Sequence, residues 1–292
     1  MGMNPAEQLA LCLTGDAQNA VRSYAERITN VRIRCSGCTT LEMMDGGCID
    51  LAPMDRSEFD HLLLRLMDNS VYARAGEIRN GYFTAAGGFR VGVCGRIDAD
   101  SVDLSGITSI CIRFARQKIG CARRLHEIIA REPYASMMIV SPPGMGKTTM
   151  LRDLARSLSG IGAQIAIADE RREICGCICG VPGLDVGVRT DIMDVCAKHI
   201  AIPMLVRCMA PDIVIADEIG NAADADCLLD ARRCGVAIIA SAHGRDIEET
   251  AHRKCIASLF ENGAFDYAAL LGDRVGKIVK VRDLKKGVDI VC

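Results

Sequence analysis

Apolar and polar positions follow two different patterns along this chain, and the change falls near residue 118. Up to that point, some short stretches alternate with the period of two that half-buried strands show, and others place apolar residues at helical spacing. The expected elements are helices at 16–25 and 56–67 and strands at 31–35, 40–44, 82–84, 90–97 and 107–114. They predict a smaller mixed α+β unit over residues 1–118.

After an expected linker at 116–121, continuous apolar runs alternate with amphipathic helical stretches. Apolar runs without polar alternation are typical of strands buried on both faces, and their alternation with helices favours a parallel sheet. We expect strands at 136–140, 163–169, 213–216, 236–241 and 275–281, and helices at 148–158, 191–207, 223–234 and 248–261. Residues 119–292 are therefore predicted to form an α/β domain with a mainly parallel sheet.

Composition narrows the possible functions. Half of the 292 residues are hydrophobic and a quarter are charged, so the chain can bury real cores. The net charge is −2, aromatic residues make up 4%, and tryptophan is absent, so no nucleic-acid partner is expected. The N-terminus does not resemble a signal peptide, and no apolar run approaches the roughly 20 residues that span a bilayer. We expect a cytoplasmic protein.

The sixteen cysteines are many for such a protein, and without a secretory signal they are expected to stay reduced. Cysteines expected in the core, from their apolar surroundings, are Cys94, Cys111, Cys196, Cys208 and Cys227. Metal binding has to be considered for two groups, Cys35 with Cys38, and Cys175 with Cys177 and Cys179. A zinc site normally needs a second pair at proper spacing, which neither group has nearby, although Cys48 or a distant thiol can complete one.

The segment 138–149 has the order of a strand, a phosphate-binding loop and a helix. Glycines let backbone N–H groups close on phosphates, the lysine can reach the β- and γ-phosphates, and the threonine hydroxyl can ligate Mg²⁺. Ser141 stands where G-x-x-x-x-G-K-[ST] has its first glycine. The alternative is a plain strand-to-helix turn with a surface lysine. The residues expected to bind ATP are Pro143, Gly144, Met145, Gly146, Lys147, Thr148 and Thr149.

Two carboxylates follow a later apolar strand at 213–216. Asp217 is placed to hold Mg²⁺ together with Thr148, usually through water, and Glu218 is placed to orient the attacking water or to accept its proton. The alternative is a pair of solvated acids that cap the next helix. An upstream phosphate loop favours the catalytic interpretation.

Three further residues are expected at the same sheet edge. His243 follows the strand at 236–241, so it emerges where α/β folds place ligands, and it can sense the γ-phosphate or polarise the water. Asp169 and Glu170 follow the strand at 163–169 and can join the metal and water network. A structural histidine and an acidic turn with salt bridges are the respective alternatives.

These motifs together resemble the secretion and pilus-assembly ATPases of the type II/IV superfamily. More closely, the chain resembles the family of stage III sporulation protein AA, over about residues 25 to 285. The segments that carry this closer resemblance are 81–92, 110–116, 140–149, 169–171, 185–191 and 241–244. The resemblance implies a RecA-like P-loop NTPase domain preceded by the smaller α+β domain.

The resemblance also implies an activity and partners. It implies an ATP hydrolase that works as a homo-oligomer, as a hexameric ring, with catalytic roles for Lys147, Asp169, Glu170, Glu218 and His243. Arginines of one subunit then neutralise γ-phosphate charge in a neighbour, an effect worth about 10³–10⁵ in rate for such residues generally. Candidates for this role are Arg90, Arg113, Arg116 and Arg189. The implied partners are membrane-embedded sporulation channel proteins, which would hold the protein at the mother-cell face of a membrane.

Two other interpretations remain open from the sequence. A phosphate-loop motor of the recombinase or helicase kind would need a basic groove or stacking aromatics. A scaffold that binds nucleotide without hydrolysis would keep Lys147 but would not need Glu218. Loss of activity in a Glu218→Gln protein separates the motor from the scaffold.

Overall fold

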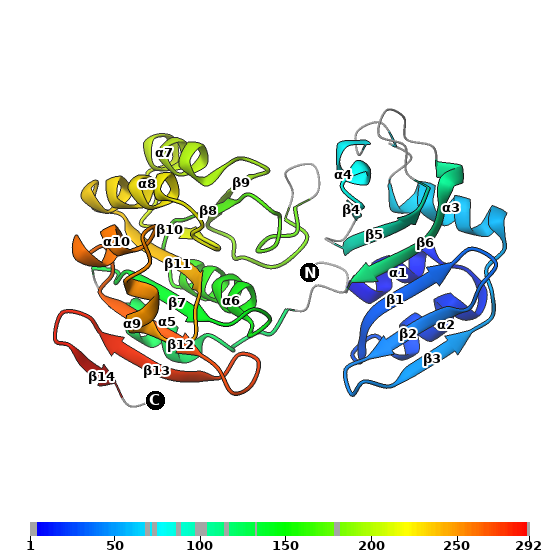
Figure 1. The fold of residues 1–292 in the computed structure, drawn as a ribbon, viewed down its shortest axis with the longest axis horizontal. Helices are drawn as coiled ribbons and strands as arrows, with labels where there is room; N and C mark the ends of the chain where they lie inside the picture. The colour runs from blue at the N-terminus through cyan, green and yellow to red at the C-terminus, as the bar shows by residue number, and fades with distance from the viewer. Residues whose placement is uncertain are drawn as a thin grey trace. The chain divides into compact units, whose positions relative to one another are not determined.

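A computed structural model describes residues 5–67, 71, 75–85, 89–96, 104–113, 117–131, 133–177 and 182–290. The chain divides into two compact units, Met1–Arg116 and Gln117–Cys292 (Figure 1). The expected boundary was after residue 118. Each unit has its own sheet.

The first unit is built on a six-stranded sheet in the order β3-β2-β1-β6-β5-β4, with antiparallel pairing throughout. Its strands are β1 (Ile28–Arg34), β2 (Thr39–Met43), β3 (Cys48–Leu51), β4 (Tyr82–Ala85), β5 (Phe89–Gly95) and β6 (Ile107–Arg113). Its helices are α1 (Pro5–Cys12), α2 (Gly15–Ser23), α3 (Arg56–Leu66) and α4 (Ala75–Arg79), with a 3₁₀ turn at Leu104–Gly106. The strands predicted here were found, and β3 was missed.

Alternation in the strands of this unit separates a core face from a polar face. Val31 and Ile33 are fully buried, whereas Arg32 between them is only partly covered. The buried face shares one core with α1, α2 and α3. Helix α3 begins at a capping box, in which the Asp55 carboxylate accepts from the Glu58 N–H and the Glu58 carboxylate accepts from the Asp55 N–H.

The second unit contains an eight-stranded sheet in the order β14-β13-β12-β7-β11-β10-β8-β9. Strands β12, β7, β11, β10, β8 and β9 are parallel, and β13 and β14 add an antiparallel edge. The strands are β7 (Met137–Ser141), β8 (Ile165–Asp169), β9 (Thr190–Asp194), β10 (Ile213–Ala216), β11 (Ala237–His243), β12 (Tyr267–Leu271), β13 (Ile278–Asp283) and β14 (Val288–Ile290). The helices are α5 (Arg123–Ile129), α6 (Lys147–Gly160), α7 (Lys198–Met209), α8 (Ala222–Arg233), α9 (Ile247–Ala251) and α10 (Ala257–Glu261).

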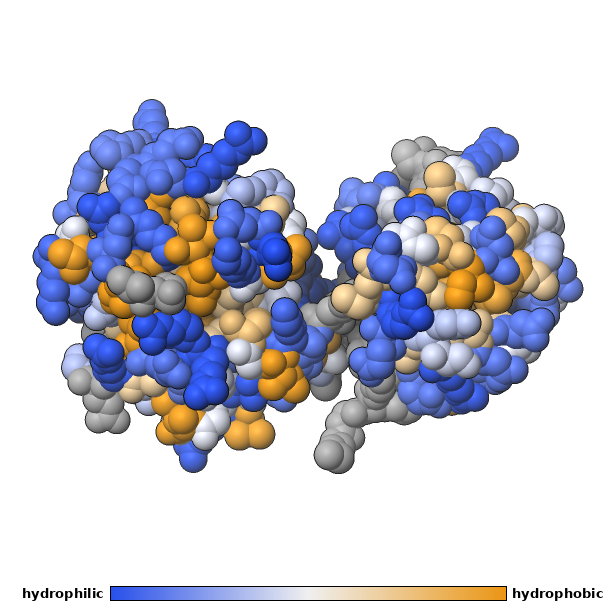
Figure 2. Space-filling model, turned by 90° about the horizontal axis from the view of Figure 1, so that it is seen from below, coloured by the Kyte–Doolittle hydropathy of each residue, from blue (hydrophilic) through white to orange (hydrophobic). Residues whose placement is uncertain are grey.

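Helices cover both faces of this sheet, which explains its uninterrupted apolar strands. Residues 137–141 are all buried, and successive positions of β7 contribute to two different cores. One core contains α5 and α6, and the other contains α7, α8, α9 and α10. At the surface, apolar side chains interrupt the charged ones in several places (Figure 2).

The prediction of one helix over 191–207 was wrong. Residues Thr190–Asp194 form β9, which pairs in parallel with β8 at the sheet edge, and α7 begins only at Lys198. All five residues of β9 are half-buried, so they lack the strong strand pattern of the central positions. The expected helix at 248–261 is divided into the two short helices α9 and α10. The elements β12, β14 and α5 were not predicted. Within the described residues, no helix is both long and apolar enough to cross a membrane.

Candidate functional site

The phosphate loop connects β7 directly to α6. Gly144 and Gly146 adopt the left-handed conformation, with φ of 76° and 92°, which only glycine adopts without strain. A Cβ on Gly146 would also lie 3.3 Å from the backbone nitrogen of Gly276, whose N–H donates to the Met145 carbonyl. The loop is therefore fixed both by its own glycines and by the hairpin between β12 and β13.

Ser141 ends β7 at the place where the common motif has glycine. Its φ is not positive, so this position does not need a glycine. The Ser141 hydroxyl donates to the Pro142 carbonyl at 2.8 Å and accepts from Lys147 Nζ at 3.3 Å. The substitution therefore adds a polar contact to the lysine without changing the course of the backbone.

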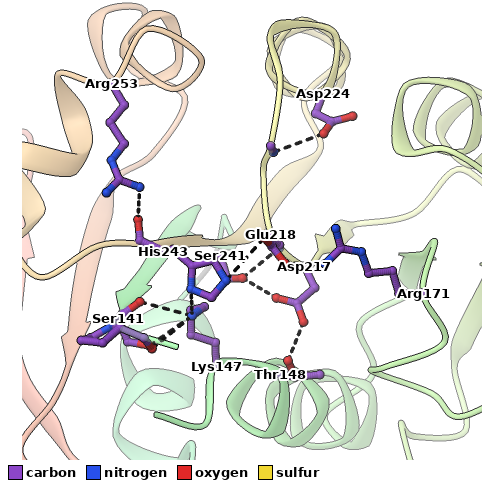
Figure 3. Close-up of polar contacts among 12 residues, drawn as sticks. Ser141, Lys147, Thr148, Arg171, Asp217, Glu218, Asp224, Ser241, His243 and Arg253 are labelled. Atoms are coloured by element: carbon purple, nitrogen blue, oxygen red, sulfur yellow. Dashed lines mark hydrogen bonds and ion pairs between the residues drawn. The ribbon is translucent and has the colours of Figure 1, made fainter. Parts of the chain in front are cut away.

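The predicted magnesium residues lie together. Asp217 follows β10, and its Oδ2 accepts from Thr148 Oγ1 at 2.6 Å, while the Ser241 hydroxyl donates to its Oδ1 (Figure 3). A carboxylate and a hydroxyl are the hard oxygen donors that suit Mg²⁺. Because both side chains meet at the start of α6, they fit a magnesium ion bound beside the phosphate loop.

Glu218 has a strained backbone and two basic neighbours. Its φ is 48°, a left-handed conformation in a residue with a side chain, and its N–H donates to the Ser241 hydroxyl at 3.0 Å. Its Oε2 accepts from Arg171 Nη1 at 2.8 Å, and its Oε1 lies 3.4 Å from His243 Nε2 (Figure 3). The carboxylate is about one-third exposed and lies next to Asp217.

Lys147 is buried, with its ammonium directed at β7 and β11. Nζ donates to the Ser141 carbonyl at 3.2 Å and lies 2.9 Å from His243 Nδ1. An ammonium nitrogen has no lone pair and can only donate. His243 Nδ1 must therefore accept this hydrogen bond, which places the proton of the imidazole on Nε2. Burial lowers the pKa of Lys147, and the charges of Asp217 and Glu218 oppose that shift.

The acidic pair Asp169 and Glu170, at the end of β8, has other partners in this structure. The Asp169 carboxylate accepts from the backbone N–H groups of residues 173, 174 and 175, and burial raises its pKa. Glu170 Oε2 accepts from Lys198 Nζ at 2.7 Å. These contacts suit a role in holding the turn, so metal or water binding by either residue stays a prediction.

The four arginine candidates are placed differently. Arg90 and Arg113 face each other across β5 and β6 of the first unit, and Arg90 lies over the Tyr82 ring at 4.3 Å. Arg189 is exposed just before β9, and its N–H donates to the Ser159 hydroxyl. Arg116 lies outside the described residues.

Sequence reasoning missed three residues of this site. They are Arg171, Ser241 and Arg253, the last of which donates to the His243 carbonyl. Ser241 offered a signal, because alternate residues of a strand share a face and Ser241 precedes His243 by two positions. The contacts of Arg171 and Arg253 depend on loops whose course the pattern did not predict.

The cysteines described by the structure are free thiols. Cys227 is buried as expected, but Cys94 and Cys208 are exposed, contrary to the prediction that they lie in the core. Cys94 occupies a polar-face position of β5, where alternation turns it outward. Among the described residues, no three His, Cys, Asp or Glu side chains are arranged to hold a metal ion, and Cys179 lies outside this set.

Comparison with solved structures shows a shared fold. The chain matches the Legionella pneumophila ATPase DotB with a TM-score of 0.59, at 12% identity over 87% of this chain and 74% of that one. It matches the pilus retraction motor PilT with bound ADP with a TM-score of 0.62, at 12% identity over 86% and 76% of the two chains. These likenesses establish a secretion-ATPase fold.

Comparison of sequences identifies the family. The chain is 38% identical over 273 residues to stage III sporulation protein AA of Bacillus subtilis (strain 168), covering 89% of this chain and 88% of that protein. Residues 52–288 match the family model described as sporulation stage III, protein AA. With a phosphate loop joined to an acidic strand end and this similarity over most of its length, the chain belongs to the family of sporulation stage III protein AA.

Proposed function

We propose that this protein is an ATPase that drives or assembles a membrane channel complex between mother cell and forespore during sporulation. The observation that carries the proposal is the 2.6 Å hydrogen bond from Thr148 Oγ1 to Asp217 Oδ2. It joins the phosphate loop to a carboxylate far along the chain, and Lys147 lies beside both. The fold shared with PilT, which was solved with ADP, favours the same class of ligand.

The residues of the loop supply a complete phosphate-binding set. Backbone N–H groups around Gly144 and Gly146 and the start of α6 face the phosphates, and Lys147 adds a cation for the β- and γ-phosphates. Thr148 and Asp217 would hold Mg²⁺, which neutralises phosphate charge when it is bound. Such groups stabilise the charge that develops in phosphoryl transfer.

Glu218 is the group proposed to accept the proton of the attacking water. Hydrolysis forms a bond from the water oxygen to the γ-phosphorus and breaks the bond to the β-phosphate oxygen, and the water proton passes to a base. A cavity of about 10 Å³ lies against Asp217, Glu218 and Arg171, close to the volume that one water molecule needs. His243, which contacts Lys147 and faces Glu218, is placed to sense the phosphates.

The proposed assembly is a homo-oligomeric ring, with six subunits as the expected number. Arg90 and Arg113 stand opposite each other in the register of β5 and β6, so two cations lie on one face of the first unit's sheet, which favours an anion there. The anion proposed for this face is the γ-phosphate bound by a neighbouring subunit. Channel proteins that span the membrane would hold the ring at the cytoplasmic, mother-cell face.

Phosphate release by the full-length protein tests the proposal. Lys147→Ala is expected to lower turnover by at least about 100-fold, because the lysine stabilises transferred charge. Lys286→Ala is the matched control, because Lys286 is exposed and lies far from the loop. It follows the end of β13, which pairs with the start of β12, and the loop lies at the opposite edge of the sheet. Equal turnover in wild type and Lys147→Ala would refute hydrolysis at this site.

The ring is tested by mixing inactive subunits. If Arg113 acts on a neighbour, mixing Lys147→Ala with Arg113→Ala subunits restores part of the turnover, because some interfaces then contain both native residues. No recovery from mixtures that do co-assemble would contradict action in trans.

A further inference from the structure

A continuous chain of contacts links the phosphate-binding lysine to the protein surface. It runs from Ser141 through Lys147, His243 and Glu218 to Arg171, with neighbouring polar atoms 2.8 to 3.4 Å apart (Figure 3). Lys147 is buried, whereas 63% of the Arg171 side chain is exposed. Arg171 is not among the residues predicted to bind or hydrolyse ATP.

The turn that carries Arg171 is rigidly anchored to the phosphate-loop helix. Arg152 of α6 is buried and donates to the Glu173 and Ile174 carbonyls, and the Asp169 carboxylate accepts three backbone N–H groups of the same turn. The neighbouring side chain of Arg172 pairs with Asp194. The backbone beneath Arg171 is thus fixed, while its own long side chain extends across the site to Glu218.

Each link of the chain orients the next. Arg171 holds one carboxylate oxygen of Glu218, and the other oxygen faces His243 Nε2. With its proton on Nε2, the imidazole presents the Nδ1 lone pair to the ammonium of Lys147. Groups that fix one nitrogen of an imidazole also fix the direction of the other.

In this geometry, His243 and a bound triphosphate would compete for the ammonium group of Lys147. A triphosphate in the loop needs the donors of Lys147, and His243 Nδ1 takes one of them at 2.9 Å. A ligand binds more weakly when part of the population is held in a competing arrangement. Any residue that steadies this arrangement therefore lowers nucleotide affinity without touching nucleotide.

We infer that Arg171 is a positioning residue that restrains nucleotide binding: by holding Glu218, it keeps His243 in contact with Lys147, and nucleotide binding releases Arg171. This inference rests on the proposed ATP site.

Binding of a fluorescent ADP and a fluorescent nonhydrolysable ATP analogue to the full-length protein tests this inference. Arg171→Ala is expected to bind both nucleotides about two- to fivefold more tightly than wild type, the size of a partly exposed ion pair. Arg171→Lys keeps the cation and should restore affinity toward wild type. The difference should shrink in 1 M salt, because the Arg171–Glu218 pair is partly exposed and salt weakens exposed ion pairs. A purely structural loss would weaken binding instead.

Two further variants distinguish the proposed role of Arg171 from other causes of altered nucleotide affinity. Arg233→Ala removes an equally exposed arginine, paired with Asp230 at the end of α8, and should leave affinity unchanged. Glu218→Gln weakens the same pair from the other side, and the double variant should bind no more tightly than the tighter single variant. Weaker binding of the ATP analogue with unchanged ADP binding would make Arg171 a phosphate ligand and overturn the inference, as would unchanged binding of both. No nucleotide binding by wild type would instead refute the proposed function.

Discussion

At the scale of single residues, two positions of the phosphate loop require glycine because of their backbone angles. Gly144 and Gly146 both have positive φ, but only Gly146 would place a Cβ against a neighbour, the backbone of Gly276. Gly146→Ala should therefore lower the free energy of unfolding by more than the roughly 1–2 kcal/mol of a left-handed alanine, and weaken nucleotide binding. Gly144→Ala, with nothing within 4 Å, is the matched control. Equal unfolding free energies of the two variants in urea would contradict this account.

The principal site residues could be predicted because each follows an apolar strand in a recognisable motif. Lys147, Asp217 and His243 meet at one sheet edge, as parallel strands require. The role of Arg171 could not be predicted, because its partner lies 47 residues away and its direction depends on a turn fixed by buried side chains. The hydrogen bonds that the Asp169 carboxylate accepts could not be predicted either, since no local pattern indicates that the backbone four to six residues later turns back toward it.

At the scale of elements, the helix that follows the phosphate loop also anchors the entry into the second unit. Asp153 of α6 is buried and accepts from the N–H groups of Gly120 and Ala122 and from Arg156. Burial acts to raise the pKa of Asp153, but these donors outweigh burial and hold its pKa below the ordinary range of an aspartate. The sequence predicted a linker here but not its attachment.

Asp153→Ala is expected to lower the free energy of unfolding of the second unit by about 2–4 kcal/mol near neutral pH, because buried donors lose a charged acceptor. A carboxyl with a depressed pKa stabilises the fold above its unfolded value and loses that effect as pH falls through the folded value. The difference between wild type and variant should therefore persist down to about pH 4 and shrink below it. Urea unfolding at several pH values measures this, with exposed Asp230→Ala as the control. A difference that grows on acidification would contradict the assignment.

Of the strands in the second sheet, β7, β8, β10, β11 and β13 were predicted, whereas β9 and β14 at the two edges and β12 between β13 and β7 were not. The strand expected at 213–216 has the observed bounds of β10, since central strands are apolar on both faces. Residues 190–207 carry apolar positions that fit either a half-buried edge strand or a helix, and only pairing with β8 decides the first part of the segment. Tertiary contacts, rather than local preference, determine such segments.

At the scale of the whole molecule, the residues proposed to act on ATP come from two compact units of the chain. The second unit holds the loop, the acidic strand end and the histidine, and the first holds a sheet face with Arg90 opposite Arg113, which is proposed to act on a neighbouring subunit. This division suits a motor whose nucleotide cycle changes contacts between subunits, because hydrolysis removes the γ-phosphate that the arginines are proposed to hold. Membership of the sporulation stage III protein AA family gives that motor its proposed setting.

The central claim, that Glu218 drives hydrolysis of ATP held by Lys147, is tested most directly by following one turnover in Glu218→Gln. The amide keeps the shape of the side chain but cannot accept the proton. We predict that this variant retains unhydrolysed ATP with Mg²⁺ on the protein while phosphate release falls at least about 100-fold below wild type. Phosphate release at the wild-type rate from Glu218→Gln would contradict the account.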